Sequence, residues 1–537
     1  MARTGAELVI ETLVAAGVEH LFTVSGNQIL SLYDATIGRG IALIHARHEA
    51  AAVHMADAWG RLTDRPGVAL VTAGPGHRNA LSALYGARMA ETPVVLLSGH
   101  SPRSQMGAGA FQEVDQVAAA RPVTKAAWLV EDPERLGAEV ATALALAASG
   151  RPGPVHLSLP GDVLEAAVSS PRAAPTPEAI PPSPPLGDGP IREVLTLLAG
   201  ARRPLILTGP AMARGERAAL VARLSEVTGA PVLPIESPRG VNDPWLHGAT
   251  GCLAEADLVL LLGKALDFSL GFGEGPAFSG RCRFVQITAD ARLTAERVAL
   301  AICGDPSVAA AQLAAAARER EWRPSSWRAA VSASRAATPS AWEELRHSSR
   351  EPLHPLRVCA ALQPLLDAGA LLVSDGGEFG QWAQAALETE TRLINGLSGS
   401  IGSGIPMAIG ARLARPGLPV VVTLGDGTFG YHALELDTAL RYRLPVVVVV
   451  GNDARWNAEY QLQVRHYGAA RAVGCDLLPA RYDRVAAALG GHGEFVERSE
   501  ELGGALARAM ASGLPACVNV LIENAAAPTF RAGGHAH

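Results

Sequence analysis

The chain of 537 residues is too long for one hydrophobic core, so about two to four domains of 100–200 residues are expected. Its hydrophobic fraction of 48% and charged fraction of 18% exclude an intrinsically disordered chain. The net charge of −6 comes without any cluster of basic residues, which excludes a nucleic-acid partner and favours a small-molecule substrate.

The first twenty residues lack the basic and apolar segments of a secretory signal. They are predicted to form an amphipathic helix. No uninterrupted apolar run reaches the roughly 18 residues that a membrane helix needs. The six cysteines include no CxxC pair, which is typical of buried thiols in a reducing compartment. We therefore expect a cytoplasmic protein with no membrane partner.

Short apolar runs such as VALVTAG, DLVLLLG and LPVVVVVGND alternate with alanine-rich stretches along the whole chain. Runs that are apolar at every position predict strands buried on both faces, and hence parallel sheets covered by helices. Segments rich in proline or charge divide the chain, which predicts an α/β fold of three doubly wound parallel-sheet domains. The predicted parts are a first domain at 1–168, a proline-rich linker at 169–189, a central Rossmann-like domain at 190–320, a second linker at 321–352, a third domain at 353–525 and a flexible tail at 526–537.

Polar residues follow two neighbouring predicted strands of the third domain. The first strand ends in GDGT, which includes Asp426, and the valine run at 446–450 is followed by Asn452 and Asp453. Adjacent parallel strands end at the same edge of a sheet, so Asp426 and a second oxygen ligand are expected to share a cation that holds a diphosphate. Taken alone, Gly-Asp-Gly more often forms a simple turn.

The spacing from Gly425 to Asp453 resembles the metal–diphosphate motif of thiamine-diphosphate-dependent enzymes. The segments RHEAAA and GPGHRNAL in the first domain, GAFQEVDQVAAARPVTKAA after them and GLSGSIGSG in the third domain are similar to the same superfamily. They most resemble acetolactate synthases, 2-hydroxyacyl-CoA lyases and benzaldehyde lyase. The resemblance covers nearly the whole chain, and it implies a pyrimidine-binding first domain and a diphosphate-binding third domain.

This resemblance implies a lyase, carboligase or decarboxylase that acts on a C–C bond beside a carbonyl, through a carbanion at C2 of the cofactor. The implied substrate is a 2-oxo acid, a 2-hydroxy ketone or a 2-hydroxyacyl-CoA, and the implied cofactors are thiamine diphosphate and Mg²⁺. For the central domain, a structural role is favoured over binding of FAD or ADP, because no GxGxxG motif is present. Each cofactor in the superfamily is held between two chains, which implies a homodimer at minimum and favours a homotetramer.

The resemblance also assigns roles to residues. Glu49 is expected to bond to the aminopyrimidine of the cofactor, and Ile401 to hold the cofactor in a bent conformation. The expected metal ligands are Asp426, Asp453 and the carbonyl of Arg455; Asn452 stays an alternative, because the superfamily usually has Asn where Asp453 stands.

The other expected site residues fall into three groups. Further cofactor-binding residues are Gly74, Asn79, Gly377, Gly425, Gly427 and Thr428. The expected substrate pocket comprises Ser25, Asn27, Gln28, Phe111, Gln112, Trp382 and Trp456. Gln28 and Gln112 are also expected to take part in catalysis together with Glu49.

Two other functions stay open at the level of the sequence. Three α/β domains also suit a flavin- or nicotinamide-dependent oxidoreductase, although the glycine-rich fingerprint is missing. A catalytically idle relative that binds thiamine diphosphate would have a broken site, and the presence of Glu49 and Asp426 disfavours it.

Overall fold

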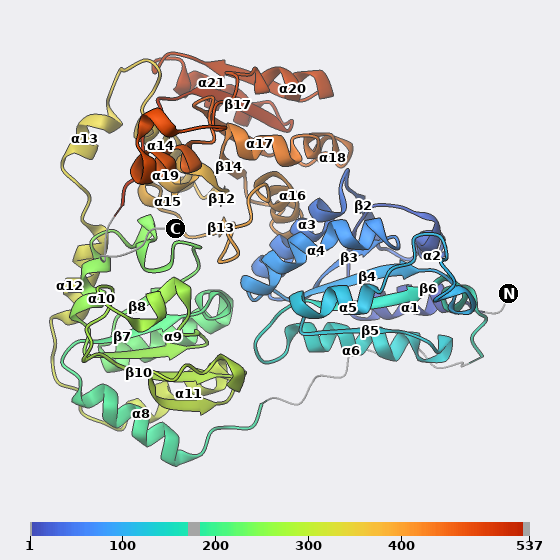
Figure 1. The fold of residues 1–537 in the computed structure, drawn as a ribbon, viewed down its shortest axis with the longest axis horizontal. Coiled ribbons are helices and arrows are strands. Elements are labelled where there is room, and N and C mark those ends of the chain that lie inside the picture. Colours follow the sequence, from blue (N-terminus) through green and yellow to red (C-terminus); the bar gives the residue numbers. More distant parts are fainter. Residues whose placement is uncertain (1–2, 170–182, 530–537) are drawn as a thin grey trace.

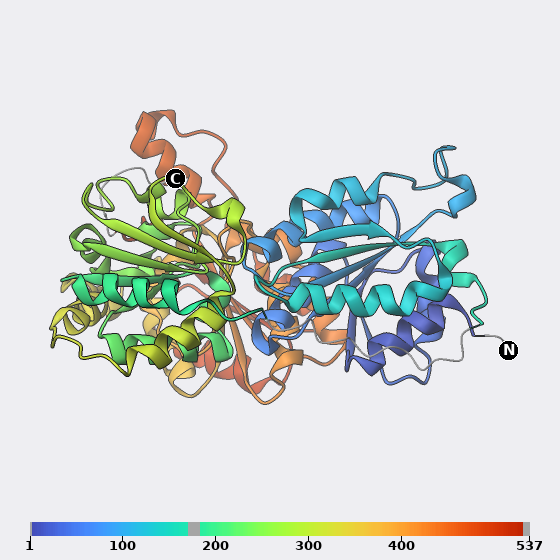
Figure 2. The same ribbon diagram turned by 90° about the horizontal axis from the view of Figure 1, so that it is seen from below.

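The computed structural model describes residues 3–169 and 183–529, which form three domains, each around one sheet (Figure 1). Most of the predicted linker 169–189 and the end of the predicted tail 526–537 lie outside the described residues. Every strand pair of the three sheets is parallel, so the predicted fold class is confirmed. Figure 2 shows the N-terminal and central domains side by side, with the C-terminal domain behind them.

The N-terminal and C-terminal sheets share one strand order. The N-terminal sheet runs β2 (Ala42–His45), β1 (His20–Thr23), β3 (Gly67–Val71), β4 (Val94–His100), β6 (Val155–Pro160) and β5 (Ala126–Leu129). The C-terminal sheet runs β13 (Arg392–Ile394), β12 (Leu371–Ser374), β14 (Val420–Gly425), β15 (Val447–Asn452), β17 (Ala516–Leu521) and β16 (His492–Val496). In each sheet the order reverses on either side of the first strand, so the switch points lie between β1 and β3 and between β12 and β14. Open parallel sheets bind ligands at such points, beyond the carboxyl ends of the strands.

The central sheet has five strands, in the order β11 (Val298–Cys303), β10 (Arg283–Thr288), β9 (Leu258–Leu262), β7 (Pro204–Thr208) and β8 (Val232–Pro234). The order reverses between β7 and β9, because β8 lies on one side of β7 and all later strands lie on the other. The central domain therefore has a switch point of its own.

Helices surround the three sheets. In the N-terminal domain they are α1 (Gly5–Ala15), α2 (Leu30–Ala35), α3 (Glu49–Thr63), α4 (Pro75–Met89), α5 (Gln116–Ala120), α6 (Leu136–Ala148) and α7 (Gly161–Glu165). The central domain has α8 (Asp188–Gly200), α9 (Gly215–Thr228), α10 (Ala249–Glu255), α11 (Pro306–Ala317) and α12 (Trp327–Ala336). The remaining helices are α13 (Ala341–Arg346), α14 (Pro355–Asp367), α15 (Gly377–Ala386), α16 (Gly404–Ala414), α17 (Asp426–His432), α18 (Glu435–Arg441), α19 (Asn457–Tyr467), α20 (Tyr482–Leu489) and α21 (Leu502–Ala511). Among the described residues, none of these helices is both long and apolar enough to cross a bilayer.

The predicted linker 321–352 contains α12 and α13. Trp327 and Val331 of α12 are buried in the core of the central domain, and Trp327 Nε1 donates a hydrogen bond to the carbonyl oxygen of Pro204 at 3.0 Å. Because Trp327 and Val331 are four residues apart, they lie on the same face of α12, and this face is apolar although the helix is mostly polar. The central domain therefore extends beyond the predicted end at residue 320.

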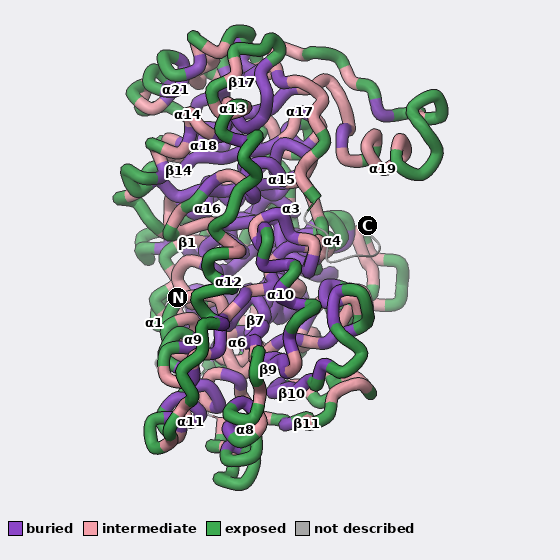
Figure 3. The backbone as a smooth tube through the Cα atoms, turned by 90° about the vertical axis from the view of Figure 1, so that its left-hand side faces the viewer, coloured by how far each residue is buried: buried purple, intermediate pink, exposed green. Residues whose placement is uncertain are grey.

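Helix α3 joins the N-terminal domain to the C-terminal domain. Every residue of α3 from Ala50 to Arg61 is buried (Figure 3), because α3 lies between its own sheet and α16 (Figure 1). One continuous core contains Ala52 and Met55 of α3 together with Met407 of α16. The closest approach is at Gly410, where an added Cβ atom would lie 2.4 Å from the carbonyl oxygen of Met55.

We expect Gly410→Ala to lower the free energy of unfolding by about 1–3 kcal/mol, because the methyl group meets backbone that cannot rotate away. Gly503→Ala is the matched control: Gly503 is also helical, but nothing lies within 4 Å of an added Cβ atom. This control is expected to stabilise the protein by up to about 1 kcal/mol, because alanine has the higher helix propensity. Urea unfolding followed by tryptophan fluorescence measures both effects, and equal midpoints for the two variants would contradict the close packing of α3 on α16.

Candidate functional site

A pocket of about 160 Å³ opens at the switch point of the C-terminal sheet, where the loops after β12, β14 and β15 meet. Strand β14 continues directly into α17, whose first residue is Asp426, and Asp453 follows the last residue of β15. The register pairs Gly425 with Gly451, which brings the two strand ends to the same level of the sheet. Both aspartates line the pocket.

The two aspartates form a buried acidic pair. Burial raises the pKa of Asp426 to about 6, although the backbone N–H groups of Gly427 and Arg455 offset part of this effect. Burial and the negative charge of Asp426 together raise the pKa of Asp453 to about 7. The Oδ2 atom of Asp426 is buried and has no hydrogen-bond partner among the described residues. The negative charge of each carboxylate disfavours ionisation of the other, and one carboxylate oxygen has no partner in the described part of the chain. Such a pair is suited to bind a divalent cation.

Asn452, the alternative metal ligand, points away from this pocket. Its Nδ2 atom donates to the Ala480 carbonyl oxygen and to Asn519 Oδ1, both at 3.0 Å, and its Oδ1 atom accepts from Ala454 N at 3.2 Å. Asp453 lies one residue beyond the strand and faces the pocket, where Asn457 Nδ2 donates to its Oδ2 atom at 2.7 Å. The geometry thus favours Asp453 over Asn452 as the partner of Asp426.

Arg455 and Trp456 complete this wall of the pocket. Arg455 Nε donates to Asp476 Oδ1 at 2.9 Å, so its side chain is engaged outside the acidic pair. The Trp456 ring covers Gly427, where an added Cβ atom would lie 2.8 Å from the ring. Gly427 and Thr428 belong to the first turn of α17, where backbone N–H groups that lack a partner within the helix suit a diphosphate.

The loop around Ile401 is fixed by a carboxylate that the sequence analysis did not select. Asp375, at the end of β12, accepts hydrogen bonds from the backbone N atoms of Gly376 at 2.7 Å, Gly402 at 3.2 Å and Gly404 at 2.6 Å. Ile401 lines the pocket, and an added Cβ atom on Gly376 would lie only 2.3 Å from its Cγ2 atom. Asp375 therefore positions Ile401 over the neighbouring glycines, including Gly377 with its φ of +87°.

Trp382 does not line this pocket, which corrects the expectation from the sequence. It lies 5% exposed in a separate cluster with Trp342 and Leu356, and its ring also contacts His354. The physical reason is the period of α15. Successive residues of a helix are rotated by about 100°, so Trp382 points away from Gln381 and Gln384, which line the pocket, and towards Trp342 and His354.

The central domain contributes a cation that the sequence analysis missed. Ser237, Pro238 and Arg239 follow β8 and line the pocket of the C-terminal domain. Burial lowers the pKa of Arg239, and the nearby negative charge of Glu378 opposes this shift. The segment PVLPIESPRG carries a strand followed by polar residues, but the sequence does not show that this strand ends beside another domain.

A second group of candidate residues lies at the switch point of the N-terminal sheet. Glu49 is the first residue of α3, and its Oε2 atom accepts a hydrogen bond from Asn79 Nδ2 at 2.9 Å. Its Oε1 atom lies 3.4 Å from the position of a Cβ atom on Gly76, in the first turn of α4. Asn79 thus orients a half-buried carboxylate whose other oxygen lies beside the glycine-rich turn.

Gln28 and Gln112 lie near the same switch point. Thr72 Oγ1, directly after β3, donates to Gln28 Oε1 at 2.5 Å. An added Cβ atom on Gly74 would lie 2.4 Å from the Gln112 carbonyl oxygen, so the loop that carries Gln112 closes over Gly74. The N-terminal candidates therefore gather at one sheet edge, as a group distinct from the acidic pair.

The N-terminal group is open to solvent in the single chain. Ser25 and Asn27 are exposed, and the side chain of Phe111 is 71% exposed. No described residue of the N-terminal domain lines the pocket of Asp426 and Asp453. One chain thus holds two separate groups of candidate site residues.

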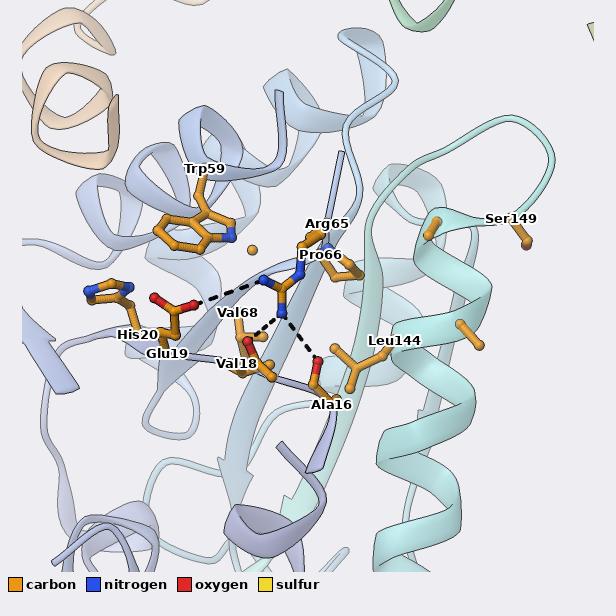
Figure 4. A pocket seen from close by; sticks show the side chains of 14 residues that line it. Ala16, Val18, Glu19, His20, Trp59, Arg65, Pro66, Val68, Leu144 and Ser149 are labelled. Atoms are coloured by element: carbon orange, nitrogen blue, oxygen red, sulfur yellow. Dashed lines mark hydrogen bonds and ion pairs between the residues drawn. The ribbon is translucent and has the colours of Figure 1, made fainter. Parts of the chain in front are cut away.

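A larger cavity, of about 330 Å³, lies elsewhere in the N-terminal domain (Figure 4). It is bounded by His20 and Gly67, which begin β1 and β3, so it lies at the amino ends of the strands, opposite Glu49. Arg65 partly spans it, with Nη2 donating to the Ala16 carbonyl oxygen at 3.4 Å. This cavity contains none of the residues selected for catalysis or cofactor binding.

Comparison with known proteins identifies the class to which these sites belong. Family models match all three domains: "Thiamine pyrophosphate enzyme, N-terminal TPP binding domain" over residues 3–119, "central domain" over 191–313 and "C-terminal TPP binding domain" over 375–520. The chain therefore belongs to the thiamine pyrophosphate (thiamine diphosphate) enzyme family.

Similar proteins within this family have different names. Acetolactate synthase large subunit IlvG of Mycobacterium tuberculosis is 36% identical over 526 residues, which covers 96% of this chain and 95% of that protein. 2-Hydroxyacyl-CoA lyase 2 of Caenorhabditis elegans is 32% identical over 593 aligned residues, covering 97% and 90% of the two chains. Oxalyl-CoA decarboxylase of Escherichia coli K12 is 30% identical over 541 residues, covering 97% and 95%.

The residues of the C-terminal pocket fit the cofactor of this family. The acidic pair and the free Oδ2 atom of Asp426 suit Mg²⁺, and the surrounding glycines leave backbone accessible to a diphosphate. Among residues 3–169 and 183–529, no three His, Cys, Asp or Glu side chains form a complete metal cage. A backbone carbonyl, water and phosphate oxygens would fill the remaining positions, which is the usual arrangement for Mg²⁺.

We expect Mg²⁺ to stabilise the protein increasingly as the pH rises from 5 to 8. Folded-state pKa values of about 6 and 7 exceed the unfolded value, so the stability that these carboxyls contribute is present below about pH 4 and is lost as the pH rises through 6 and 7. A bound cation offsets this loss once the protons have left. Thermal unfolding in EDTA and in Mg²⁺ at each pH measures the difference.

Asp453→Asn tests the assignment of this effect to the acidic pair. It should flatten the pH dependence in EDTA and weaken Mg²⁺ binding by roughly tenfold or more. Asp34→Asn, at an exposed position of α2, is the control and should leave both unchanged. An undiminished Mg²⁺ effect in Asp453→Asn would show that the cation binds elsewhere.

Proposed function

We propose that this protein is a thiamine-diphosphate- and Mg²⁺-dependent lyase, carboligase or decarboxylase that acts on a C–C bond beside a carbonyl. The observation that carries the proposal is that two switch points, in sheets with the same strand order, both carry candidate site residues. One presents the acidic pair Asp426 and Asp453, and the other presents Glu49 oriented by Asn79. None of the three similar proteins is named as an oxidoreductase, which disfavours the flavin- or nicotinamide-dependent alternative.

The chain would divide the work of cofactor binding between its domains. Asp426 and Asp453 would hold the cation, Gly427 and Thr428 would donate to the diphosphate, and Ile401 would support the cofactor from the side. Glu49 would hold a proton at the aminopyrimidine ring. The cofactor, when bound, supplies the nucleophile and the electron sink that this chemistry requires.

Arg239 supports a substrate with an anionic end. It is a partly buried cation at the rim of the pocket, near Glu378, and no ion pair within 4 Å engages its guanidinium among the described residues. A carboxylate, or a phosphate group of a coenzyme A moiety, would complete its charge balance. This favours a 2-oxo acid or a 2-hydroxyacyl-CoA over an uncharged 2-hydroxy ketone.

The active assembly is proposed to be at least a homodimer, and a homotetramer is the favoured form. The pocket of one chain lacks every N-terminal candidate, so a second copy would supply Glu49. Apolar side chains exposed in the single chain, including Phe111, Tyr467 and Leu478, are suited to burial against another copy. Two sites per dimer follow from this arrangement.

A panel of pyruvate, benzoylformate, oxalyl-CoA, a 2-hydroxyacyl-CoA and benzoin, with added thiamine diphosphate and Mg²⁺, tests the reaction class. For the substrate that is turned over, Glu49→Gln should lower kcat by roughly 10²- to 10⁴-fold, because the carboxyl can no longer exchange a proton. Glu19→Gln is the control at the opposite sheet edge and should retain wild-type turnover. Full activity of a folded Glu49→Gln protein would remove Glu49 from the mechanism.

A further inference from the structure

The switch point of the central sheet lies between the ends of β7 and β9, at Gly209 and Gly263. The equivalent positions of the other two sheets carry the candidate site residues. By the same topological rule, this crevice is the position where the central domain would bind a ligand. A side chain from another domain occupies it.

Glu91, in the turn between α4 and β4 of the N-terminal domain, extends its carboxylate into the crevice. Its Oε2 atom accepts a hydrogen bond from Ala211 N at 3.0 Å, and its Oε1 atom accepts one from Arg151 Nε at 2.7 Å. A Cβ atom on Gly209 would lie 3.1 Å from Oε2 and 3.2 Å from Oε1. Glu91 is only 2% exposed, so its charge is held by these contacts rather than by water.

The crevice is rich in cations. Arg151 of the N-terminal domain and Arg217 line it, and Arg217 is paired with Asp64 at 3.2 Å. Lys264, directly after Gly263, is 3% exposed and paired with Asp267. Arg214 donates from Nη2 to the carbonyl oxygens of Ala90 at 2.9 Å and Glu91 at 3.0 Å. The donors that reach the oxyanion position are Ala211 N and Arg151 Nε, and a carboxylate is the oxyanion that the chain itself provides.

The backbone of Glu91 has a conformation that is unfavourable for its residue type. Its φ is +53°, in the left-handed region that glycine and asparagine tolerate best. Such a conformation persists where surrounding contacts hold it in place. Here the contacts are those of its own carboxylate and carbonyl oxygen with Arg151, Ala211 and Arg214.

Little room remains for another ligand. The free space beside Glu91 is about 10 Å³, at the lower limit for a single water molecule. Asp290, two residues after β10, is engaged by Arg292 Nε and Nη2, both at 2.8 Å.

We propose that the central domain has an anion-binding site at its switch point, and that the ligand of this site is the Glu91 carboxylate of the same chain. The site closes the central domain to the phosphate groups of a nucleotide. It also couples the N-terminal and central domains through the hydrogen bonds that Ala211 N and Arg214 Nη2 of the central domain donate to Glu91. The proposal does not depend on the reaction that the protein catalyses.

Removal of the carboxylate should convert the internal site into one for an external oxyanion. Glu91→Gly is the main variant, because glycine adopts a φ of +53° without strain. Glu91→Asn also tolerates this backbone, removes the charge and leaves a shorter side chain, so it serves if the glycine variant fails to fold. Glu216→Gly, at an exposed position of the central domain, is the control.

Isothermal titration calorimetry with inorganic phosphate, in the presence of EDTA, measures phosphate binding at this site. Any binding at the C-terminal pocket is common to all proteins, so the test is the additional binding in the Glu91 variants. We expect one additional phosphate site in Glu91→Gly or Glu91→Asn, and its loss when Arg151→Met is added. We expect no such site in wild type or Glu216→Gly, and no ADP binding by the wild type.

Two results would overturn the proposal. One is saturable ADP binding by the wild-type protein that Arg151→Met abolishes, since the crevice would then be open to nucleotides. The other is the absence of additional phosphate binding in a Glu91 variant with a native circular dichroism spectrum.

Discussion

The burial of α3 against α16 determines where the chemistry of this protein can take place. Glu49 is the first residue of α3, and the helix behind it is buried from Ala50 to Arg61. At Gly410 the backbone of α16 lies directly against the backbone of α3. This close packing holds the N-terminal group of site residues rigidly relative to the C-terminal domain of the same chain. Among the described residues, the pocket of Asp426 and Asp453 in the same chain nevertheless contains none from the N-terminal domain. This separation is the basis of the proposal that a second copy of the chain completes the site.

The three switch points give the molecule a simple functional division. The N-terminal one presents a carboxylate with a hydrogen-bonding partner, and the C-terminal one presents two carboxylates that repel each other and suit a cation. In the proposal made above, the central one is occupied by Glu91 from the neighbouring domain. The same topology thus yields two groups of candidate site residues and a third position that links two domains.

Much of this architecture is predictable from the sequence, because apolar runs mark buried parallel strands and polar residues follow their ends. Asp426 and Asp453 could be paired in advance, since their strands are neighbours along the chain as well as in the sheet. The sequence does not show which side of α15 Trp382 occupies, or whether Asn452 or Asp453 faces the pocket. The direction of the Trp382 side chain depends on the residue at which α15 begins, and the direction of the Asn452 side chain depends on its hydrogen bond with Asn519. Arg239 and Glu91 could not be selected either, because each acts in a domain other than its own.

Mixed subunits provide the most direct test of a site shared between chains. Glu49→Gln and Asp426→Asn subunits, each inactive alone, would be co-expressed with different affinity tags and isolated as mixed dimers. One of the two sites in such a dimer combines the intact Glu49 of one subunit with the intact Asp426 of the other, so about half of the wild-type activity is expected. Mixed dimers as inactive as the two parents would contradict the account, because they would show that both residues serve the same chain.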